Sequence, residues 1–392
     1  MTSHETDRGS VSTPLGQMTT TVGILVIARQ KNGGTLMYTL SIIDALSRLP
    51  AERYRFVIFA AHDNHEYDNL GLPIVRVPGP IKLIGMRVIG RNPFDAVEIL
   101  LAPVYTMALL ACGRPFVFTL HDMQERYFPE NFSLVTRMWR NFSNLLLTAR
   151  AARIICESMF VKRDIVKFLG VPVHKVDVVP APPISMLCGS KLDEDGIITV
   201  RLKFGLPQRY IFYPAQFWPH KNHRRLVDAF KLVLQQHPDC CLVLTGKERD
   251  EFDRVFTRVR ELALDNDVRH IGYVEKSELA ALYRGATVAV IPTLFESISI
   301  PVYEAFSVGT VVCASNVVAL PEQIGDAGLL FDPYSNEDMA EKICMLLSDP
   351  ELRASLIERG YRRMSSVTHE KYAERLSKII DEIDHSDCQL TS

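Results

Sequence analysis

Short apolar runs rich in β-branched residues alternate along the chain with longer segments in which apolar residues recur every three or four positions. Runs of the first kind predict buried strands, and segments of the second kind predict amphipathic helices. In the first half, strands are expected at 22–28, 55–60, 73–78, 115–122, 153–158 and 176–180. Helices are expected after Gly33 and Gly34 through Leu49, over about 132–150 and over 159–169. This alternation predicts a parallel sheet covered by helices on both faces.

The pattern pauses and begins again in the second half. Pro, Gly, Ser and charged residues gather at 181–196, which is typical of a connection between domains. Further strands are expected at 210–215, 241–246, 268–274, 287–292 and 310–315. The sequence therefore predicts an α/β protein with two Rossmann-like, doubly wound domains that face a central cleft. Ligands of such sheets bind beyond the carboxyl ends of the strands, so functional residues are expected in the loops that follow strands.

The same patterns give the expected domain boundaries. These are a disordered tail at 1–20, a first domain at 21–183, a linker at 184–205, a second domain at 206–366 and a final segment at 367–392. The final segment contains a helix from about 369 to 384, with one apolar face formed by Tyr372, Leu376, Ile380 and Ile383.

One long apolar stretch, 96–113, departs from the alternation. It is short for a membrane span and carries Glu98 and Pro103, so a buried helix is expected there rather than a membrane-inserted segment. The polar N-terminus lacks the apolar core of a secretory signal.

Composition limits the class of protein. The chain has 392 residues, of which 47% are hydrophobic and 23% charged, as in globular proteins of two or three domains. Its 44 Lys and Arg against 46 Asp and Glu give a net charge of −2, so no nucleic-acid partner is expected. Residues 1–180 hold 20 basic and 15 acidic side chains. This mild excess fits an anionic surface or substrate, or simple surface variation.

The eight cysteines form no CxxC pair, and no Cys/His cluster has the spacing of a zinc site. Several of them lie in apolar runs such as 153–158 and 310–315. Buried, reduced thiols are therefore expected, in keeping with a cytoplasmic protein.

The most informative polar residues follow the strand expected at 287–292. Glu296 lies in the loop, and Pro301 and Gly309 suit the start and end of a helix that carries Glu304 one turn in. Free N–H groups at such a helix start are a natural phosphate site. The two carboxylates could hold the two ends of an extended anionic ligand, with Glu304 accepting hydrogen bonds from hydroxyls such as those of a ribose. By spacing alone, two surface glutamates beside a loop remain the simpler interpretation.

The stretch from Leu294 to Gly309 resembles the Glu-x7-Glu signature of retaining glycosyltransferases of family 4, which have the GT-B fold. The usual form in that family is close to F-E-G-F-G-x-P-x-x-E-A-x-A-x-G. This chain matches it at Phe295, Glu296, Pro301, Glu304, Ala305 and Gly309. It departs at Ser297, Ile298 and Ser299, where the family has glycine, an aromatic residue and glycine. Serine there would narrow the sugar pocket or add a hydroxyl contact.

Other segments resemble the family in the same order. Lys221 matches a lysine that contacts the donor diphosphate, whereas Gln216 stands where an arginine is common, so one positive charge is missing. His121 matches a histidine near the donor sugar, where it would bond a hydroxyl or polarise developing charge. Gly33 and Gly34 match a glycine-rich loop that approaches the phosphate or the acceptor.

Two later segments extend the resemblance. Tyr273 lies in 270–274, which resembles the segment that lines the nucleotide base. The final helix resembles one that packs back on the first domain, with His369 where tryptophan is common.

The resemblance implies a retaining hexosyltransferase. It would move a sugar from a nucleotide sugar, bound by the second domain, to a hydroxyl of a glycan or lipid-linked acceptor, bound by the first. Its catalytic residues would be Glu296, His121 and Lys221. Its substrate contacts would be Gly33, Gly34, Gln216, Ser297, Ser299, Ile300, Glu304 and Tyr273.

The segment Pro-His-Lys-Asn at 219–222 resembles a subset that includes bacterial mannosyltransferases, so the expected donor is GDP-mannose rather than a UDP- or ADP-linked sugar. Neither a metal nor another cofactor is expected.

Two other functions stay open, and two are disfavoured. A nucleotide-sugar epimerase on the same fold stays open, and it would need no acceptor. A phosphorylase is disfavoured, because it usually needs a pyridoxal lysine and a longer chain. A catalytically silent binder of nucleotides or glycans is kept open by Gln216, Ser297 and Ser299. A plain scaffold is disfavoured because polar residues gather at several strand ends.

The basic first half permits peripheral contact with the inner face of a membrane. The side chains that could touch anionic headgroups are Arg137, Arg140, Arg150 and Arg153. For each of them alone, a solvated helix face is the simpler interpretation.

Overall fold

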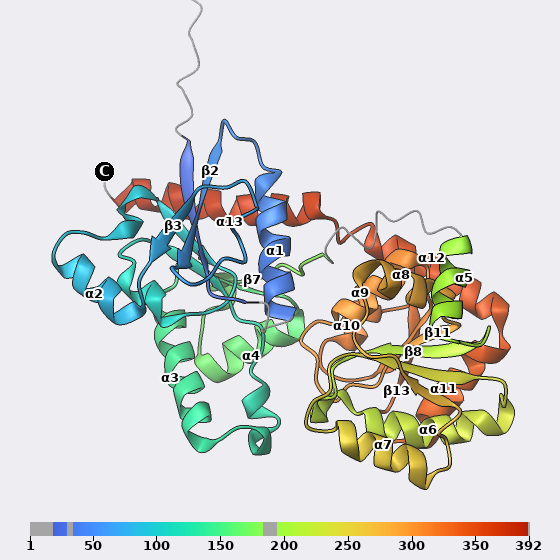
Figure 1. The fold of residues 1–392 in the computed structure, drawn as a ribbon. Coiled ribbons are helices and arrows are strands. Elements are labelled where there is room, and N and C mark those ends of the chain that lie inside the picture. Colours follow the sequence, from blue (N-terminus) through green and yellow to red (C-terminus); the bar gives the residue numbers. More distant parts are fainter. Residues whose placement is uncertain (1–18, 30–33, 183–193, 391–392) are drawn as a thin grey trace, which may run out of the picture.

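The computed structural model describes residues 19–29, 34–182 and 194–390, which form two α/β domains (Figure 1). Within these residues the first sheet has seven strands, all parallel, in the order β3-β2-β1-β4-β5-β6-β7. They are β1 (Thr20–Val26), β2 (Tyr54–Ala61), β3 (Ile74–Val77), β4 (Ile99–Ala102), β5 (Phe116–Thr119), β6 (Arg153–Cys156) and β7 (Val176–Val178). The strand order turns back at β1, as in a doubly wound sheet.

Helices connect these strands and cover both faces of the sheet. They are α1 (Gly34–Ser47), α2 (Pro80–Val88), α3 (Leu134–Arg150) and α4 (Met159–Leu169), with 3-10 turns η2 (Pro93–Ala96), η3 (Met107–Ala111), η4 (Gln124–Arg126), η5 (Pro129–Asn131) and η6 (Val173–Lys175). Neighbouring residues of one strand belong to different cores, because successive side chains point to opposite faces. Leu100 packs in one core, and Leu101 packs in the other, with residues of α1.

The second domain repeats this plan. Its described residues form a parallel sheet in the order β10-β9-β8-β11-β12-β13. The strands are β8 (Tyr210–Pro214), β9 (Cys241–Thr245), β10 (Val268–His270), β11 (Val288–Ile291), β12 (Val312–Ser315) and β13 (Gly328–Phe331). The helices are α5 (Glu194–Lys203), α6 (His223–Gln236), α7 (Phe252–Glu261), α8 (Lys276–Gly285), α9 (Ile300–Val308), α10 (Leu320–Ile324), α11 (Asn336–Ser348) and α12 (Pro350–Met364), with the 3-10 turn η7 (Pro219–Lys221). The α/β class with two Rossmann-like domains, predicted from the alternation, is confirmed.

The helix predicted at 96–113 is wrong. Residues 99–102 form β4, which lies between β1 and β5, and 107–111 form the short turn η3. Periodicity cannot distinguish a strand buried on both faces from a buried helix, since both are continuously apolar. Across the described residues, no helix is both long enough and apolar enough to cross a membrane.

The boundaries of the linker and of the tail also differ from the expected ones. Residues 194–203, placed in the linker, form α5, which packs on α8 of the second domain. The expected disordered tail ends too late, because β1 already begins at Thr20. The rest of the expected tail, 1–18, and the linker residues 184–193 lie outside the described residues.

Helix α13 (His369–Leu390) leaves the second domain and runs along the first, beside α1 (Figure 1). Its apolar face joins the core that α1 and the first sheet form, through Tyr372, Leu376, Ile380 and Ile383. The Tyr372 hydroxyl donates to that of Tyr38 at 3.3 Å, and Arg53 pairs with Asp381 at 2.6 Å. The last helix is therefore part of the first domain's core.

We expect Ile380→Ala to lower the unfolding free energy of the first domain by about 2–5 kcal/mol, because it leaves a cavity at a side chain that is 1% exposed. Urea unfolding would measure the loss. The matched control is Lys378→Ala on the outer face of the same helix, where the side chain is 68% exposed. Equal stability of the two variants would contradict this role of α13.

Candidate active site

A cavity of about 660 Å³ lies between the two domains, beyond the carboxyl ends of both sheets. The first domain lines it with α1 and with the ends of β5 and β6, through residues such as Tyr38, His121 and Glu157. The second domain lines it with the loops after β8 and β11 and with the start of α9. The cleft expected from the topology is where the polar residues gather.

Lys221 and Glu296, 75 positions apart in sequence, form an ion pair in this cavity. The Lys221 Nζ donates to Glu296 Oε2 at 2.6 Å, and both side chains are less than one fifth exposed. The lysine comes from η7 after β8, and the glutamate comes from the loop after β11. A bound anion would therefore compete with Glu296 for the charge of Lys221.

Backbone bonds tie these two loops together. The carbonyl of His220 accepts from the N–H of Leu294 at 2.8 Å and from Thr293 Oγ1 at 3.1 Å. Asn222, which follows Lys221, has φ of 61°, a left-handed conformation that asparagine tolerates better than most residues. Its amide donates to the carbonyls of Pro292 and Pro333 at 2.9 and 3.0 Å. The segment 219–222 thus holds Lys221 in a fixed place beside the loop of Glu296.

Arg249 supplies a second cation beside Lys221. The sequence comparison with the resembling family indicated that this charge is absent at Gln216. Its Nε donates to Gln216 Oε1 at 3.0 Å, and its guanidinium lies 5.1 Å from the ring centroid of Trp218. All three side chains line the cavity. The loop after β9 therefore places a guanidinium on Gln216, where the resembling family commonly has an arginine.

Helix α9 begins and ends where the sequence predicted, with Pro301 in its first turn and Gly309 at its C-cap with φ of 76°. Glu304 faces the cavity from one turn in and accepts a hydrogen bond from the Tyr283 hydroxyl at 2.8 Å. Burial raises the pKa of Glu304 to about 7, although the bond from Tyr283 acts in the opposite direction. Its ionised form is thus poorly solvated and would gain from hydroxyl donors.

Gln323 of α10 holds the loop that leads into α9. Its Oε1 accepts from the N–H of Ser299 at 2.9 Å, and its Nε2 donates to the carbonyl of Ser299 at 2.7 Å. Because the Ser299 N–H is engaged and Pro301 has none, neither can bind a phosphate. Anion binding at this helix start therefore rests on fewer N–H groups than the sequence suggested.

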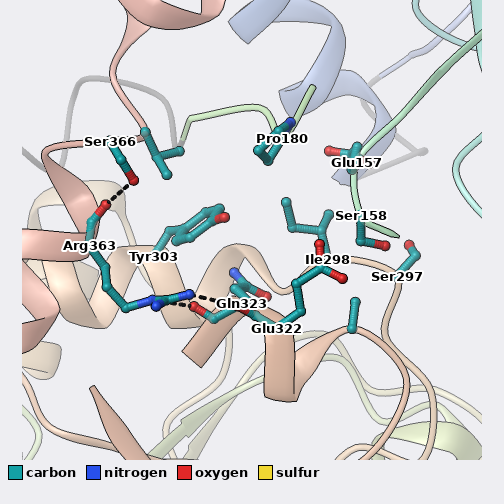
Figure 2. Close-up of a pocket in the computed structure, with 12 residues that line it drawn as sticks. Glu157, Ser158, Pro180, Ser297, Ile298, Tyr303, Glu322, Gln323, Arg363 and Ser366 are labelled. Carbon is teal, nitrogen blue, oxygen red and sulfur yellow. Dashed lines mark hydrogen bonds between the residues drawn. The ribbon is translucent and has the colours of Figure 1, made fainter. Parts of the chain in front are cut away.

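A smaller cavity of about 170 Å³ lies beside Ser297 and Ile298 (Figure 2). It shares Glu157, Ser297, Ile298 and Tyr303 with the larger cavity. Next to it, the carboxylate of Glu322 accepts from the N–H of Met159, at the start of α4, at 2.8 and 3.1 Å. A carboxylate at a helix start is stabilised by the helix dipole, so this contact joins the two domains.

His121 is held at both ring nitrogens. Its Nδ1 donates to Glu157 Oε2 at 2.9 Å, and its Nε2 donates to the carbonyl of Pro103 at 3.1 Å. Burial opposes the charged form, but the carboxylate of Glu157 outweighs it and raises the pKa of His121. Both partners can only accept, which favours the imidazolium. In this arrangement His121 presents a positive ring to the cavity and has no nitrogen free for a sugar hydroxyl, contrary to one of the roles expected for it.

Phe295 anchors the loop of Glu296 in the first domain. Its ring lies 5.6 Å from that of Tyr127, 6.1 Å from that of Phe128 and 6.5 Å from that of Phe160. Phe295 is 5% exposed, so this second-domain side chain is buried by first-domain aromatic residues. The position of Phe295, directly before Glu296, is thus fixed by contacts with both domains.

Most of the predicted site residues meet in the larger cavity. Those that line it are Gly34, His121, Gln216, Lys221, Glu296, Ser297, Ile300 and Glu304. Two predictions are not supported by their positions. Ser299 is 1% exposed and does not line the cavity, and its hydroxyl has no hydrogen-bond partner among the described residues. Tyr273 is 73% exposed and does not line the cavity, because β10 ends at His270 and leaves it on the surface. Gly33 lies outside the described residues.

Arg249, Gln323 and Glu157 are the site residues that the sequence did not reveal. Arg249 and Gln323 lie 33 and 24 positions from the residues they hold, and no local spacing connects them. For Arg249, the missing charge at Gln216 was the available signal, and a search for arginines after neighbouring strands would have found it.

No group of three or more His, Cys, Asp or Glu side chains is placed to hold a metal in 19–29, 34–182 and 194–390. The chain has two Asp-x-Asp runs, 193–195 and 265–267, and no described residue of either lines the cavity. Metal independence stays a prediction. Six cysteines are free and buried, namely Cys112, Cys156, Cys240, Cys241, Cys313 and Cys344.

Sequence comparison places both halves of the chain in known families. Residues 33–182 match the model described as glycosyltransferase family 4, and residues 198–363 match glycosyl transferases group 1. The chain is 29% identical over 259 residues to O-antigen chain mannosyltransferase B of Escherichia coli, a match covering 62% of this chain and 64% of that protein. It is 24% identical over 261 residues to the serotype-specific mannosyltransferase WbdA of Escherichia coli, covering 62% of this chain and 31% of the relative. The matches thus span less than two thirds of either relative.

The fold also has solved counterparts. The Anabaena protein Alr3699/HepE, in complex with UDP and glucose, superposes with a TM-score of 0.74 at 18% identity, covering 93% of this chain and all of the other. At this identity the likeness shows the fold alone.

We expect Gln323→Met to lower kcat/KM for transfer by about 10–100-fold, because it frees the backbone of Ser299 and lets the loop of Glu296 shift. Steady-state kinetics would measure this, with Gln235→Met on the exposed face of α6 as the matched control. Unchanged kinetics in a folded Gln323→Met protein would remove Gln323 from the site.

Proposed function

We propose that this chain, which belongs to the group 1 glycosyltransferases of GT-B fold, transfers a mannosyl group from a nucleotide sugar to a hydroxyl of a glycan or lipid-linked acceptor with retention of configuration. One observation carries the proposal. Two cations from separate loops, Lys221 and Arg249, converge with the carboxylates Glu296 and Glu304 on one interdomain cavity. That set suits a ligand with a diphosphate between two hydroxylated sugars, as in a nucleotide sugar.

The two cations would stabilise the leaving diphosphate. As the bond to the sugar breaks, negative charge grows on the diphosphate, and fixed cations in a cavity shielded from water favour that state. Lys221 is neutralised by Glu296, so donor binding would redirect it from the carboxylate to a phosphate. Arg249 places a positive charge beside Gln216, where the family commonly has an arginine. The absent charge at Gln216 was one argument for a silent binder, so that alternative is weakened.

The two carboxylates would accept hydrogen bonds from the hydroxyls of the donor's two sugars. Glu304, one turn into α9, would accept hydrogen bonds from the ribose hydroxyls. Glu296, once released by Lys221, would bind hydroxyls of the transferred sugar. His121 would face that sugar with the positive charge that Glu157 maintains, and so counter charge on the departing phosphate.

The carboxylates that line the cavity are engaged by partners in a way that favours front-face transfer. Glu157 pairs with His121 and Asp122 pairs with Arg140 at 2.8 Å, whereas Glu296, once released by Lys221, would be engaged by hydroxyls of the transferred sugar. A carboxylate held in an ion pair is a weak nucleophile. We infer that the leaving phosphate itself takes the acceptor's proton, on the face from which the acceptor attacks. Closure of the domains would exclude water and limit hydrolysis of the donor.

The choice of sugar and base rests on relatives. The likeness to two mannosyltransferases supports mannose. The base is open to experiment, because GDP-mannose follows from the resemblance of 219–222, whereas a structural neighbour holds UDP. The acceptor would be read by first-domain loops around Gly34 and Tyr38.

Transfer from GDP-mannose, compared with UDP-glucose, to a panel of mannose-terminated and lipid-linked acceptors would test the proposal. We expect turnover that EDTA does not change, and NMR should show the donor's anomeric configuration in the product. Binding of a nucleotide sugar without turnover on any acceptor would favour the silent binder instead.

We expect Lys221→Ala to lower kcat by about 10²–10³-fold, the usual effect of removing one group that stabilises a leaving charge. Arg249→Gln should lower kcat/KM by about 10–100-fold through a lost charge-assisted contact. The matched control is Arg254→Gln, whose side chain is 70% exposed and pairs with Glu251. An effect of Arg254→Gln equal to that of Arg249→Gln would show that general charge, rather than position, matters.

Glu304→Gln should stabilise the empty protein above pH 7 and weaken nucleotide-sugar binding by about 10–100-fold. The folded chain holds the Glu304 proton up to about pH 7, whereas the unfolded chain releases it near 4.5. The folded state therefore binds more protons in that window, and this group's contribution to stability falls as pH rises through it. Glutamine cannot ionise and avoids the loss.

Melting temperatures at pH 5 and pH 8, with calorimetric titration of the donor, would check both effects. The melting temperature of the variant should exceed that of the wild type clearly at pH 8 and little at pH 5. Glu248→Gln, an exposed neighbour of the cavity, is the control. A variant that binds the donor as the wild type does would exclude Glu304 from the nucleotide site.

A further inference from the structure

Helix α3 turns an apolar face to the outside. Its large exposed apolar side chains, between 43% and 77% exposed, are Leu134, Val135, Met138, Trp139, Phe142 and Leu145. At 3.6 residues per turn they fall within an arc of about 140°. Soluble proteins rarely expose a continuous apolar face of this kind, and where they do it marks a surface that binds something.

The opposite face of α3, which packs on the first domain, is largely polar. Ser143, Asn144 and Thr148 are buried there beside Leu147. The amide of Asn144 has no hydrogen-bond partner among the described residues. The helix is thus amphipathic in the reverse sense to a surface helix, whose apolar face is normally the buried one. Helix α3 contains enough apolar residues to fill a buried face, but most of the large ones lie on the exposed face.

The charged side chains of helix α3 itself are all basic. Helix α3 carries Arg137, Arg140 and Arg150 and no acidic residue. Arg140 is taken up by Asp122 and Glu125, at 2.8 Å from each, while Arg137 and Arg150 are exposed. The expected role of Arg153 at a membrane does not hold, because it pairs with Asp177 and Glu382.

Helix α2 adds to the same end of the first domain (Figure 1). Both α2 and α3 pack on η3. Helix α2 ends at Val88, and Val88 and the following Ile89 are 81% and 66% exposed. This helix too has basic residues, Lys82 and Arg87, and no acidic ones.

We propose that α3 and the end of α2 form a docking surface for an anionic lipid membrane. A helix in the membrane interface places Trp, Phe, Met and Leu among the acyl chains and its arginines among the headgroups, which is the distribution seen here. The exposed Lys82, Arg137 and Arg150 lie on two helices that carry no acidic residue. They fit a surface of negative charge better than they fit a second copy of this chain, whose same face is also basic. The surface lies outside the lining of the larger cavity, so docking leaves the cavity accessible.

Flotation of the full chain with vesicles of phosphatidylcholine, with and without 30% phosphatidylglycerol, tests the proposal. We expect binding to the anionic vesicles that falls as salt rises, and little binding to the neutral ones. Met138→Gln combined with Phe142→Gln should weaken binding tenfold or more, without a change in melting temperature. The matched control is Leu202→Gln combined with Met345→Gln, two exposed apolar residues of the second domain.

The chain has two tryptophans, Trp139 on this surface and Trp218 in the cavity. In Trp218→Phe the remaining fluorescence is that of Trp139, and we expect a shift to shorter wavelength and quenching by brominated acyl chains on anionic vesicles. In Trp139→Phe both signals should disappear. Because these measurements use the empty protein, they are independent of whether the chain transfers a sugar.

Three results would overturn the proposal. These are no flotation at low salt, equal binding to neutral and anionic vesicles, and a concentration-dependent dimer in sedimentation that the Met138/Phe142 variant abolishes. The last would show that a second copy covers this face.

Discussion

The loop from Thr293 to Ile300 is the constraint on which the candidate site depends, because both domains hold it. Its start is bonded to the carbonyl of His220, and Phe295 is buried among aromatic residues of the first domain. Its end is fixed by Gln323. Glu296 lies between these anchors and meets Lys221 as a result. A shift of either domain would move the carboxylate of Glu296 relative to Lys221. The geometry of the site therefore depends on how far the cleft is closed.

Charge in the empty cavity is balanced in pairs. Glu296 neutralises Lys221, and Glu157 maintains the charge of His121. An unpaired ion in a partly buried site is costly, so such pairs let the cavity persist without a ligand. An incoming diphosphate would replace a carboxylate as the partner of a cation, and the released carboxylate would then be available to hydroxyls. The same side chains thus serve the stability of the empty form and the recognition of a donor.

The sequence predicted the elements that rest on local rules. Pro301 and Gly309 mark the ends of α9 because one lacks an N–H and the other tolerates positive φ. Strands flanked by polar loops were found, since buried β-branched runs are distinctive. β4 was missed because it is buried on both faces, and β13 because its segment, Gly328–Phe331, contains no β-branched residue. Tyr273 was expected in the site by resemblance alone, and its strand ends three residues too early for it to face the cavity.

The sequence by itself determined the two doubly wound domains, the cleft between them and several of the polar residues that line it, because strand ends of parallel sheets converge whatever the loops contain. Only the tertiary structure decided which charges meet. Arg249 reaches Gln216 because β8 and β9 are neighbours in the sheet, and Gln323 reaches Ser299 because α10 packs beneath the loop. The outward apolar face of α3 was equally hidden, since a helical period shows that a face exists but not which side the fold covers. Such contacts depend on strand order and on the packing of distant segments, and no local stretch of the sequence shows either.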